Sequence, residues 1–364
     1  MRESPFAANL IPKDPQTRPI TACILQRSPP SMSFVSRSFR KSLLLLLGGL
    51  LFPALTASAA GWETVRHDGR DYVTVRSIRK FYNFQSMKVT GSFLELENRA
   101  VKIKFTIGGQ EVFMNNVKFV FSFKVLPLQG RYLVSRIDLG KLVDPVLRPS
   151  YIQTSNPFDT VIIDPGHGGN DPGAVNRHGK EANYNLAVGR ILKQQLETRG
   201  FKVIMTRNSD RFLSLTERVD LANRFQNAIF ISIHFNSGGR GRAQGIETFT
   251  LSPAGVAHYG RGLRKDDFQL RNGNTQDSAN IALATAVHST CLLKTGRPDR
   301  GIRRARFSVL TGVRHPAILL EGGFMSHSYE ARLIANATYQ RTIAGAITDA
   351  VMKYRLATMR RPQR

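Results

Sequence analysis

The chain has 364 residues, a formal net charge of +26 and a hydrophobic fraction of 41%. That apolar fraction is ample for a sizeable core and excludes a disordered chain, and the length allows about two domains after removal of a targeting segment. The positive charge predicts an anionic partner, such as nucleic acid, a membrane surface or an acidic polymer.

Residues 1–59 have the features of a leader followed by a secretory signal peptide. Arg37, Arg40 and Lys41 come directly before the apolar run 43–55, and the small residues 57–59 follow it. This order is typical of a cleaved signal, and the run is shorter than the roughly 20 residues of a membrane span. An uncleaved anchor is the alternative interpretation. Met32 would give a signal of ordinary length, so we consider it an alternative start.

The signal peptide predicts an exported protein, located in the periplasm or cell envelope. For such a protein we do not expect nucleic acid as a partner. Contact with a membrane is expected only through the signal segment, if that segment stays uncleaved.

Residues 61–147 are predicted to form a small α+β domain. Two runs in which apolar and polar residues alternate indicate strands, residues 75–82 indicate a short helix, and Asn115-Asn116 and Gln129-Gly130 predict hairpin turns. The region bears a weak resemblance, without a sharp motif, to the small N-terminal domain named after copper amine oxidases that recurs in envelope proteins. We infer no copper or other ligand from it.

Residues 148–158 contain two prolines and several polar residues, so we interpret them as a linker. Strand and helix patterns alternate from 159 to 357, which predicts an α/β domain with a mostly parallel sheet flanked by helices. Strands are expected at 161–163, 202–206, 228–233, 246–251, 307–310 and 317–320, and helices at 181–199, 215–225, 277–294 and 339–354. Ser214 and Glu217 predict a capping box before the second helix. Residues 358–364 form a basic tail.

Three of the predicted strands end in residues that can bind a metal or transfer a proton. The strand 161–163 is broken by Asp164-Pro165-Gly166 and followed by His167, since proline lacks an N–H and glycine tolerates unusual backbone angles. His234 and Glu321 follow two further strands. Because open α/β sheets bind ligands outside the carboxyl ends of their strands, this arrangement predicts a metal-assisted active site.

Glu181 is a candidate for a third metal ligand, because it begins the helix that follows the His167 loop. Zinc takes nitrogen and oxygen ligands in a tetrahedral set, and a catalytic zinc keeps one position for water. A carboxylate at a helix N-terminus is also favoured by the helix dipole without any metal, so a purely structural acid is the alternative.

Short motifs follow one another in order across the predicted α/β domain. They are 163–169 (IDPGHGG), Gly173-Ala174, Glu181 with 185–187, Thr206-Arg207, Asp210, Leu215, Arg218, 222–223, 232–236 (SIHFN), 245–247 (GIE), 299–301 (DRG), 307–310 (FSVL) and 320–324 (LEGGF). From residue 161 to about 354 the chain thereby resembles the catalytic domain of the zinc-dependent N-acetylmuramoyl-L-alanine amidases, the amidase 3 family.

The resemblance implies a zinc amidase/carboxypeptidase-like fold, Zn²⁺ as the cofactor and roles for four residues. His167, Glu181 and His234 would hold zinc, and Glu321 would be the catalytic carboxylate that accepts the water proton and returns it to the leaving amine. Zinc lowers the pKa of bound water to about 7 and can polarise the scissile carbonyl. The expected function is hydrolysis of the amide between N-acetylmuramic acid and L-alanine of peptidoglycan, in cell-wall remodelling or cell separation.

Peptidoglycan is thus the expected partner, and the sequence leaves the need for a protein activator open. One alternative is another zinc peptidoglycan peptidase, because a metal site alone does not choose the scissile bond. A second alternative is a non-catalytic wall-binding protein. For Glu321 itself, the alternative is a structural carboxylate that caps a helix or pairs with an arginine.

Other polar residues near these motifs are interpreted as structural. Glu247 lies within a predicted strand and is expected to be the charge partner of an arginine, and only secondarily a residue of the site. His288 is expected to pack within a helix, and Cys291 to be a small buried side chain. The basic segment 255–275 is either a substrate-facing loop or an ordinary solvated loop.

Overall fold

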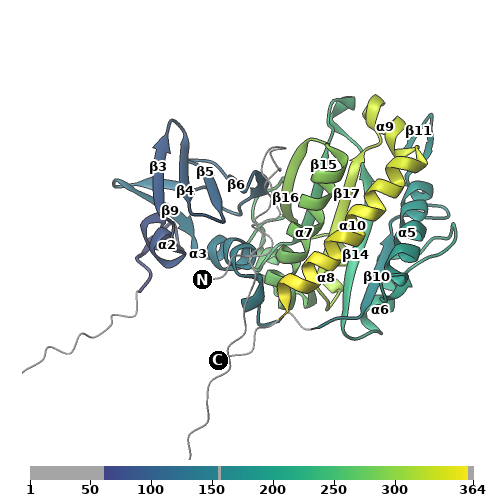
Figure 1. Cartoon of the computed structure of the whole chain (residues 1–364), viewed down its shortest axis with the longest axis horizontal. Coiled ribbons are helices and arrows are strands. Elements are labelled where there is room, and N and C mark those ends of the chain that lie inside the picture. Colours follow the sequence, from purple (N-terminus) through teal and green to yellow (C-terminus); the bar gives the residue numbers. More distant parts are fainter. Residues whose placement is uncertain (1–60, 155–156, 360–364) are drawn as a thin grey trace, which may run out of the picture. The chain divides into compact units, whose positions relative to one another are not determined.

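The computed structural model describes residues 61–154 and 157–359, so the predicted leader and signal peptide and most of the basic tail lie outside the described residues. An N-terminal domain precedes the α/β domain, and a mixed sheet of 11 strands passes through both (Figure 1). Within the described ranges, no helix is long and apolar enough to cross a membrane.

The strands of this sheet are, in order, β13 (Lys202–Met205), β10 (Thr160–Pro165), β14 (Ala228–Asn236), β17 (Ala317–Phe324), β15 (Ile246–Leu251), β16 (Asp299–Ala305), β7 (Val117–Val120), β6 (Glu111–Met114), β5 (Lys102–Thr106), β4 (Phe93–Glu97) and β3 (Ser86–Thr90). The helices of the α/β domain are α5 (Glu181–Glu197), α6 (Leu215–Asn223), α7 (Asp277–Thr295), α8 (Ser308–Gly312), α9 (Ser328–Ile334) and α10 (Ala337–Thr358). The capping box of α6 is confirmed, because Ser214 and Glu217 make both of its hydrogen bonds.

Strand direction brings the predicted strand ends together. β13, β10, β14 and β17 are parallel, whereas β15 is antiparallel to β17, and β16 is parallel to β15. The carboxyl ends of β10, β14 and β17 therefore meet the amino ends of β15 and β16 at one end of the sheet, which we call the site end. The expected sheet flanked by helices is confirmed, with β15 and β16 as the departure from parallel order.

Both faces of the α/β sheet are buried, which explains the continuous apolar runs of β10, β14 and β17. Val161 and Ile163 belong to one apolar cluster with residues of α5, α7 and α10. Ile162 belongs to a second cluster with residues of α6 and α8. Figure 1 shows α10 lying across the sheet beside α7 and α5. The helices on the two faces hold the strand ends at fixed positions.

The N-terminal domain contains α2 (Val75–Phe81) and a second sheet with the order β1 (Thr64–His67), β2 (Arg70–Thr74), β9 (Arg131–Ser135) and β8 (Leu126–Leu128). Both predicted hairpin turns are confirmed. Asn115 and Asn116 join β6 to β7 with φ values of 46° and 65°, and Gln129-Gly130 join β8 to β9 with 49° and 71°. Left-handed backbone at both central residues matches the twist of a tight hairpin.

The junction between the two domains is a continuous sheet. β16 pairs in parallel with β7, and the N–H of Lys118 donates to Asp299 Oδ2 at 2.7 Å. Arg304 of β16 pairs at 2.9 Å with Asp138 of α3 (Arg136–Asp138), and both side chains are almost fully buried. The described residues from Trp62 onward belong to one compact unit. The domain boundaries and the linker at 148–158 remain predictions.

The strand predicted at 307–310 is wrong, because α8 begins at Ser308. The strand lies just before it, in β16, whose charged sequence has no apolar pattern. Its arginines remain in the sheet because carboxylates pair with them, Asp138 with Arg304 and Glu247 with Arg303. Periodicity does not reveal a strand whose polar side chains have partners far away in the sequence.

Candidate metal centre

His167 follows β10 in a loop that comes very close to the ring of His234. The backbone of His167 has a φ of 60°. A Cβ at Gly166 would lie only 2.1 Å from Cε1 of His234, so this position accepts no side chain. Glycine therefore permits the close approach that brings the two histidines together. Their ring centroids lie 4.9 Å apart.

His167, Glu181 and His234 converge at the site end. Glu181 Oε1 lies 3.2 Å from His167 Nε2 and 3.1 Å from His234 Nδ1, and the candidate ligand atoms all lie within 4.8 Å of one another. Zinc–ligand bonds of about 2.0–2.1 Å in a tetrahedral set place neighbouring ligand atoms about 3.3 Å apart. The distances to Glu181 fit this spacing, and two imidazoles with one carboxylate form a donor set that zinc accepts.

Glu181 is buried at the first turn of α5 and receives several hydrogen bonds. The N–H of Ala174 donates to Oε2 at 3.0 Å, and the N–H of Phe235 donates to Oε1 at 3.2 Å. Burial raises the pKa of Glu181, but hydrogen bonds and charges from His167 and His234 outweigh it, so the net pKa is lowered. The carboxylate is thus ionised and suited to bind a cation.

A second carboxylate, Asp171, orients His167. Its Oδ2 lies 2.8 Å from His167 Nδ1, and its Oδ1 accepts the N–H of Gly173 at 3.1 Å. Donation from Nδ1–H to Asp171 leaves Nε2 of His167 facing Glu181. Burial lowers the pKa of His167, but Glu181 and Asp171 together raise it. Sequence reasoning missed Asp171, although its spacing from His167 in a glycine-rich loop was an available signal.

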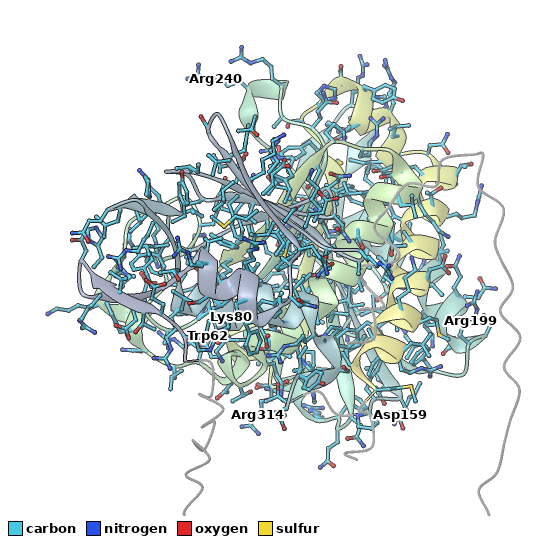
Figure 2. All side chains as sticks on the ribbon, turned by 60° about the vertical axis from the view of Figure 1, so that its left-hand side comes forward. Trp62, Lys80, Asp159, Arg199, Arg240 and Arg314 are labelled. Carbon is cyan, nitrogen blue, oxygen red and sulfur yellow. The ribbon has the colours of Figure 1, made fainter. Side chains whose placement is uncertain are left out.

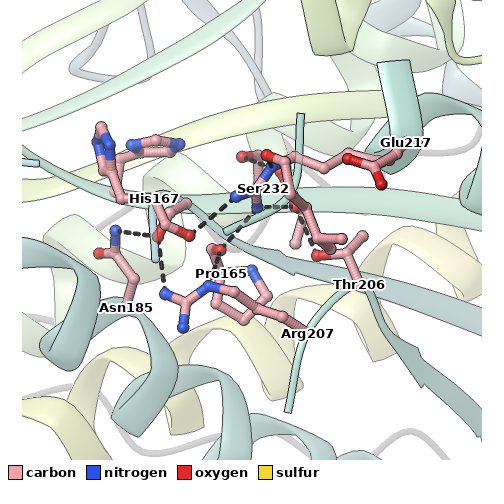
Figure 3. Close-up of polar contacts among 12 residues, drawn as sticks. Pro165, His167, Asn185, Thr206, Arg207, Glu217 and Ser232 are labelled. Carbon is pink, nitrogen blue, oxygen red and sulfur yellow. Dashed lines mark hydrogen bonds and ion pairs between the residues drawn. The ribbon is translucent and has the colours of Figure 1, made fainter. Parts of the chain in front are cut away.

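Two buried arginines hold the loop that carries His167. Arg207 donates from Nε to the carbonyl of Pro165 at 2.9 Å, and Figure 3 shows its guanidinium turned toward this loop. Arg218 donates from Nη2 to the carbonyl of His167 at 2.8 Å and pairs with Asp164 at 2.7 Å. Charge-assisted bonds to main-chain carbonyls fix the loop at the end of β10. Both arginines belong to the ordered motifs, but their supporting role was not predicted.

Glu321 lies in β17 between two cross-strand neighbours. It pairs with His234 of β14 on one side and with Glu247 of β15 on the other. Its Oε2 is buried and has no hydrogen-bond partner within the described residues. Burial raises the pKa of Glu321 well above its usual value, and the charges of Glu181 and Glu247 raise it further. A buried, unsatisfied carboxyl group beside candidate metal ligands is suited to transfer a proton.

The expectation that Glu247 is the charge partner of an arginine is confirmed. Arg300 Nε donates to Glu247 Oε1 at 2.6 Å, and Arg303 Nη1 lies 3.3 Å from the same oxygen. Asn236 Nδ2 donates to Oε2 at 2.9 Å. The neighbour of Glu321 is therefore a fixed carboxylate that faces two guanidinium groups.

The basic segment 255–275 lies at the opposite end of the sheet from Glu321. It follows the carboxyl end of β15, a strand that begins at the site end. The segment therefore does not line the site end, and whether it faces substrate stays a prediction. Part of the segment's charge is internal, because the buried Asp267 pairs with Arg261 at 2.7 Å and with Arg306 at 2.8 Å.

His288 and Cys291 have the structural roles expected of them. Both are buried in α7, and His288 contacts Thr248 Oγ1 and Asp299 Oδ1, each at 2.9 Å. Burial raises the pKa of the Cys291 thiol to about 12, so it does not supply a thiolate at neutral pH.

Residues 161–353 match the protein family described as N-acetylmuramoyl-L-alanine amidase. The uncharacterized protein YqiI of Bacillus subtilis is 33% identical over 204 residues, which are 56% of this chain and 88% of YqiI. The N-acetylmuramoyl-L-alanine amidase AmiA of Escherichia coli is 31% identical over 217 residues, with coverage of 53% of this chain and 75% of AmiA. Among solved structures, the catalytic domain of the N-acetylmuramoyl-L-alanine amidase CwlV from Bacillus (Paenibacillus) polymyxa var. colistinus is 32% identical. That comparison covers 54% of this chain and 98% of CwlV, with a TM-score of 0.46.

Proposed function

The chain belongs to the N-acetylmuramoyl-L-alanine amidase family and is a cell-wall amidase, and on this premise we propose how it acts. We propose an exported, zinc-dependent enzyme that hydrolyses the amide between N-acetylmuramic acid and the L-alanine of the peptidoglycan stem peptide. The convergence of His167, Glu181 and His234 beside Glu321 is the observation that supports this proposal most directly.

His167, Glu181 and His234 would hold the zinc ion. Bound zinc supplies a Lewis acid, which lowers the pKa of water and polarises the scissile carbonyl. The ionised Glu181 and the imidazole of His167 oriented by Asp171 are suited to this role. The buried Arg207 and Arg218 bond to carbonyls of the loop and so hold the ligand His167 in position.

Glu321 would carry the proton. It accepts a proton from the attacking water and delivers it to the nitrogen of L-alanine as the C–N bond breaks. The ionised carboxylate takes up the proton, and burial then favours the protonated form, so the group can hold the proton between these two events. Pairing of β17 with β14 fixes this carboxyl group beside the ligand His234.

Export to the periplasm or cell envelope is part of the proposal. The signal features of residues 1–59 support it, because the substrate lies outside the cytoplasm. Cell fractionation followed by N-terminal sequencing tests it. A mature chain that begins near residue 60 in the envelope fraction is expected, and an unprocessed cytoplasmic chain would contradict export.

The bond that is cleaved is tested by digestion of purified peptidoglycan with product analysis by mass. An amidase releases stem peptides with a free L-alanine amino terminus and leaves free lactyl carboxyl groups on the glycan. Cleavage within the stem peptide would instead indicate a zinc peptidase. Removal of metal with a chelator should abolish release, and added zinc should restore it.

A further inference from the structure

Arg300 lies at the site end, at a bulge that turns its side chain toward Glu247. Ile246 pairs with Asp299 but Glu247 pairs with Gly301, so Arg300 is an extra residue in β16. A bulge of this kind re-aims a side chain. Here Nε of Arg300 donates to Glu247 Oε1 at 2.6 Å.

The guanidinium of Arg300 is held by Glu247 and Phe324, whereas its two Nη atoms are available to a ligand. It lies over the ring of Phe324, with 4.9 Å from Cζ to the ring centroid, and 31% of the side chain is exposed. Its two Nη atoms make no hydrogen bond to any residue that the structure describes. Arg303 also approaches Glu247, so one carboxylate faces two guanidinium groups and excess positive charge remains. The planar guanidinium presents two N–H groups side by side, and we call this pair the fork of Arg300. Its geometry matches the two oxygens of a carboxylate.

Strand register gives the approximate distance from the guanidinium of Arg300 to Glu321, the residue proposed to act at the scissile amide. His234, Glu321, Glu247 and Gly301 occupy corresponding positions on four consecutive strands. Neighbouring strands lie about 4.8 Å apart, so a guanidinium bonded to Glu247 lies roughly 5–10 Å from Glu321. Two or three extended peptide residues span this distance, at about 3.3 Å per residue.

The positive charge of Arg300 favours a negatively charged group of the substrate, so the question is which part of the substrate carries such a group. In the proposed substrate the lactyl carboxyl of muramic acid is consumed in the amide, and N-acetylated sugars carry no charge. Negative charge therefore comes from the peptide. We propose that Arg300 binds a carboxylate of the stem peptide, two or three residues beyond the scissile amide, and makes the enzyme prefer stem peptides in which this carboxylate is free. This inference rests on the proposed function.

Arg240 is a useful comparison, because it is an exposed arginine whose side chain is not held by neighbouring residues. It is exposed on the loop that follows β14, where Figure 2 shows it projecting from the molecule, and its side chain makes no hydrogen bond or ion pair within the described ranges. Arg300, in contrast, is already ordered by Glu247 and Phe324. A pre-organised group loses less conformational freedom when it binds a ligand.

The test uses two muropeptides that differ only in whether the stem carboxylates are free or converted to carboxamides. We expect wild-type kcat/KM to favour the free acid by about tenfold or more, as for a charge-assisted hydrogen bond. Arg300→Gln should remove this preference, mainly through a higher KM for the free acid. Arg300→Lys keeps the charge without the fork and should retain part of the preference. Arg314→Gln removes an exposed charge just before the amino end of β17, away from the site end, and should retain all of the preference (Arg314 is labelled in Figure 2).

Equal preference in wild type and Arg300→Gln would overturn the inference, as would equal cleavage of both substrates by the wild type. Failure of the wild type to cleave either substrate would instead overturn the proposed function, and this inference with it. Thermal unfolding and zinc content show whether each variant is folded. If Arg300→Gln does not fold, Arg300→Lys decides the question, because unchanged preference in that variant shows that the fork does not recognise the carboxylate.

Discussion

His234 and Glu321 stand directly opposite each other on the parallel strands β14 and β17. One of these residues is a candidate metal ligand and the other is the candidate proton carrier. Because main-chain hydrogen bonds between two buried strands fix their separation, the distance between His234 and Glu321 is set by the sheet and not by a loop. The other two ligands come from the loop after β10 and from the start of α5, and these are the parts that need additional support.

Removal of the carboxylate behind His167 should weaken metal binding without unfolding the chain. Asp171→Ala deletes the acceptor for Nδ1 of His167, and we expect zinc affinity to fall about 10–100-fold. Competition with a chromophoric chelator measures the affinity, and excess zinc should restore activity. Asp171→Asn retains an acceptor and should lose less. An unchanged affinity in Asp171→Ala would show that the imidazole is oriented by other contacts.

A single methyl group should disrupt the site at Gly166. The Cβ of Gly166→Ala would lie 2.1 Å from the ring of His234, so the loop or the ring must move and the ligands must separate. We expect loss of zinc binding in a chain that still folds. Gly140→Ala is the control, because a Cβ there meets no atom within 4 Å. Equal zinc content in the two variants, measured by metal analysis, would contradict the described approach of the two histidines.

The two domains should unfold together. Arg304→Ala leaves Asp138 buried with its charge uncompensated, and we expect a loss of about 3 kcal/mol in the free energy of unfolding. Arg66→Ala breaks the exposed pair with Asp71 and should cost less than about 1 kcal/mol. Urea unfolding followed by circular dichroism measures both. Two separate transitions in the wild type would contradict the coupling through β16 and β7.

Acid should destabilise the chain partly through Asp267. Hydrogen bonding to Arg261 lowers the pKa of Asp267 most strongly, burial opposes this, and the charges of Arg261 and Arg306 lower it further. The folded pKa thus lies below the ordinary value of 3.8, so the stabilisation is present above about pH 4 and is lost as the pH falls toward the folded pKa. The fall in Tm from pH 7 to pH 3 should be smaller for Asp267→Asn than for the wild type. An identical fall would contradict this assignment.

Much of the site could be predicted from the sequence because local signals mark it. The apolar runs before His167 and Glu321 are long enough to indicate buried strands, and the break at Asp164-Pro165-Gly166 marks where the first of these strands ends. The open-sheet rule then predicts that the strand ends meet, and the structure confirms this arrangement for His234 as well.

What could not be predicted depends on partners that are distant in the sequence. β16 forms a strand without an apolar pattern. Its Arg303 and Arg304 can lie in the sheet because Glu247 and Asp138, which are far away along the chain, pair with them. The continuation of the sheet into β7 likewise depends on pairing between distant segments. The position of segment 255–275 followed from the direction of β15, which periodicity does not reveal.

In the proposed mechanism His167, Glu181 and His234 hold zinc while Glu321 moves the proton. The most direct test is to compare wild type and Glu321→Gln in one experiment that measures bound zinc and the release of stem peptides from purified peptidoglycan. We predict that both proteins bind zinc equally and that Glu321→Gln releases stem peptides at least about 100-fold more slowly. Release at the wild-type rate by the zinc-loaded variant would contradict the role of Glu321 as the proton carrier.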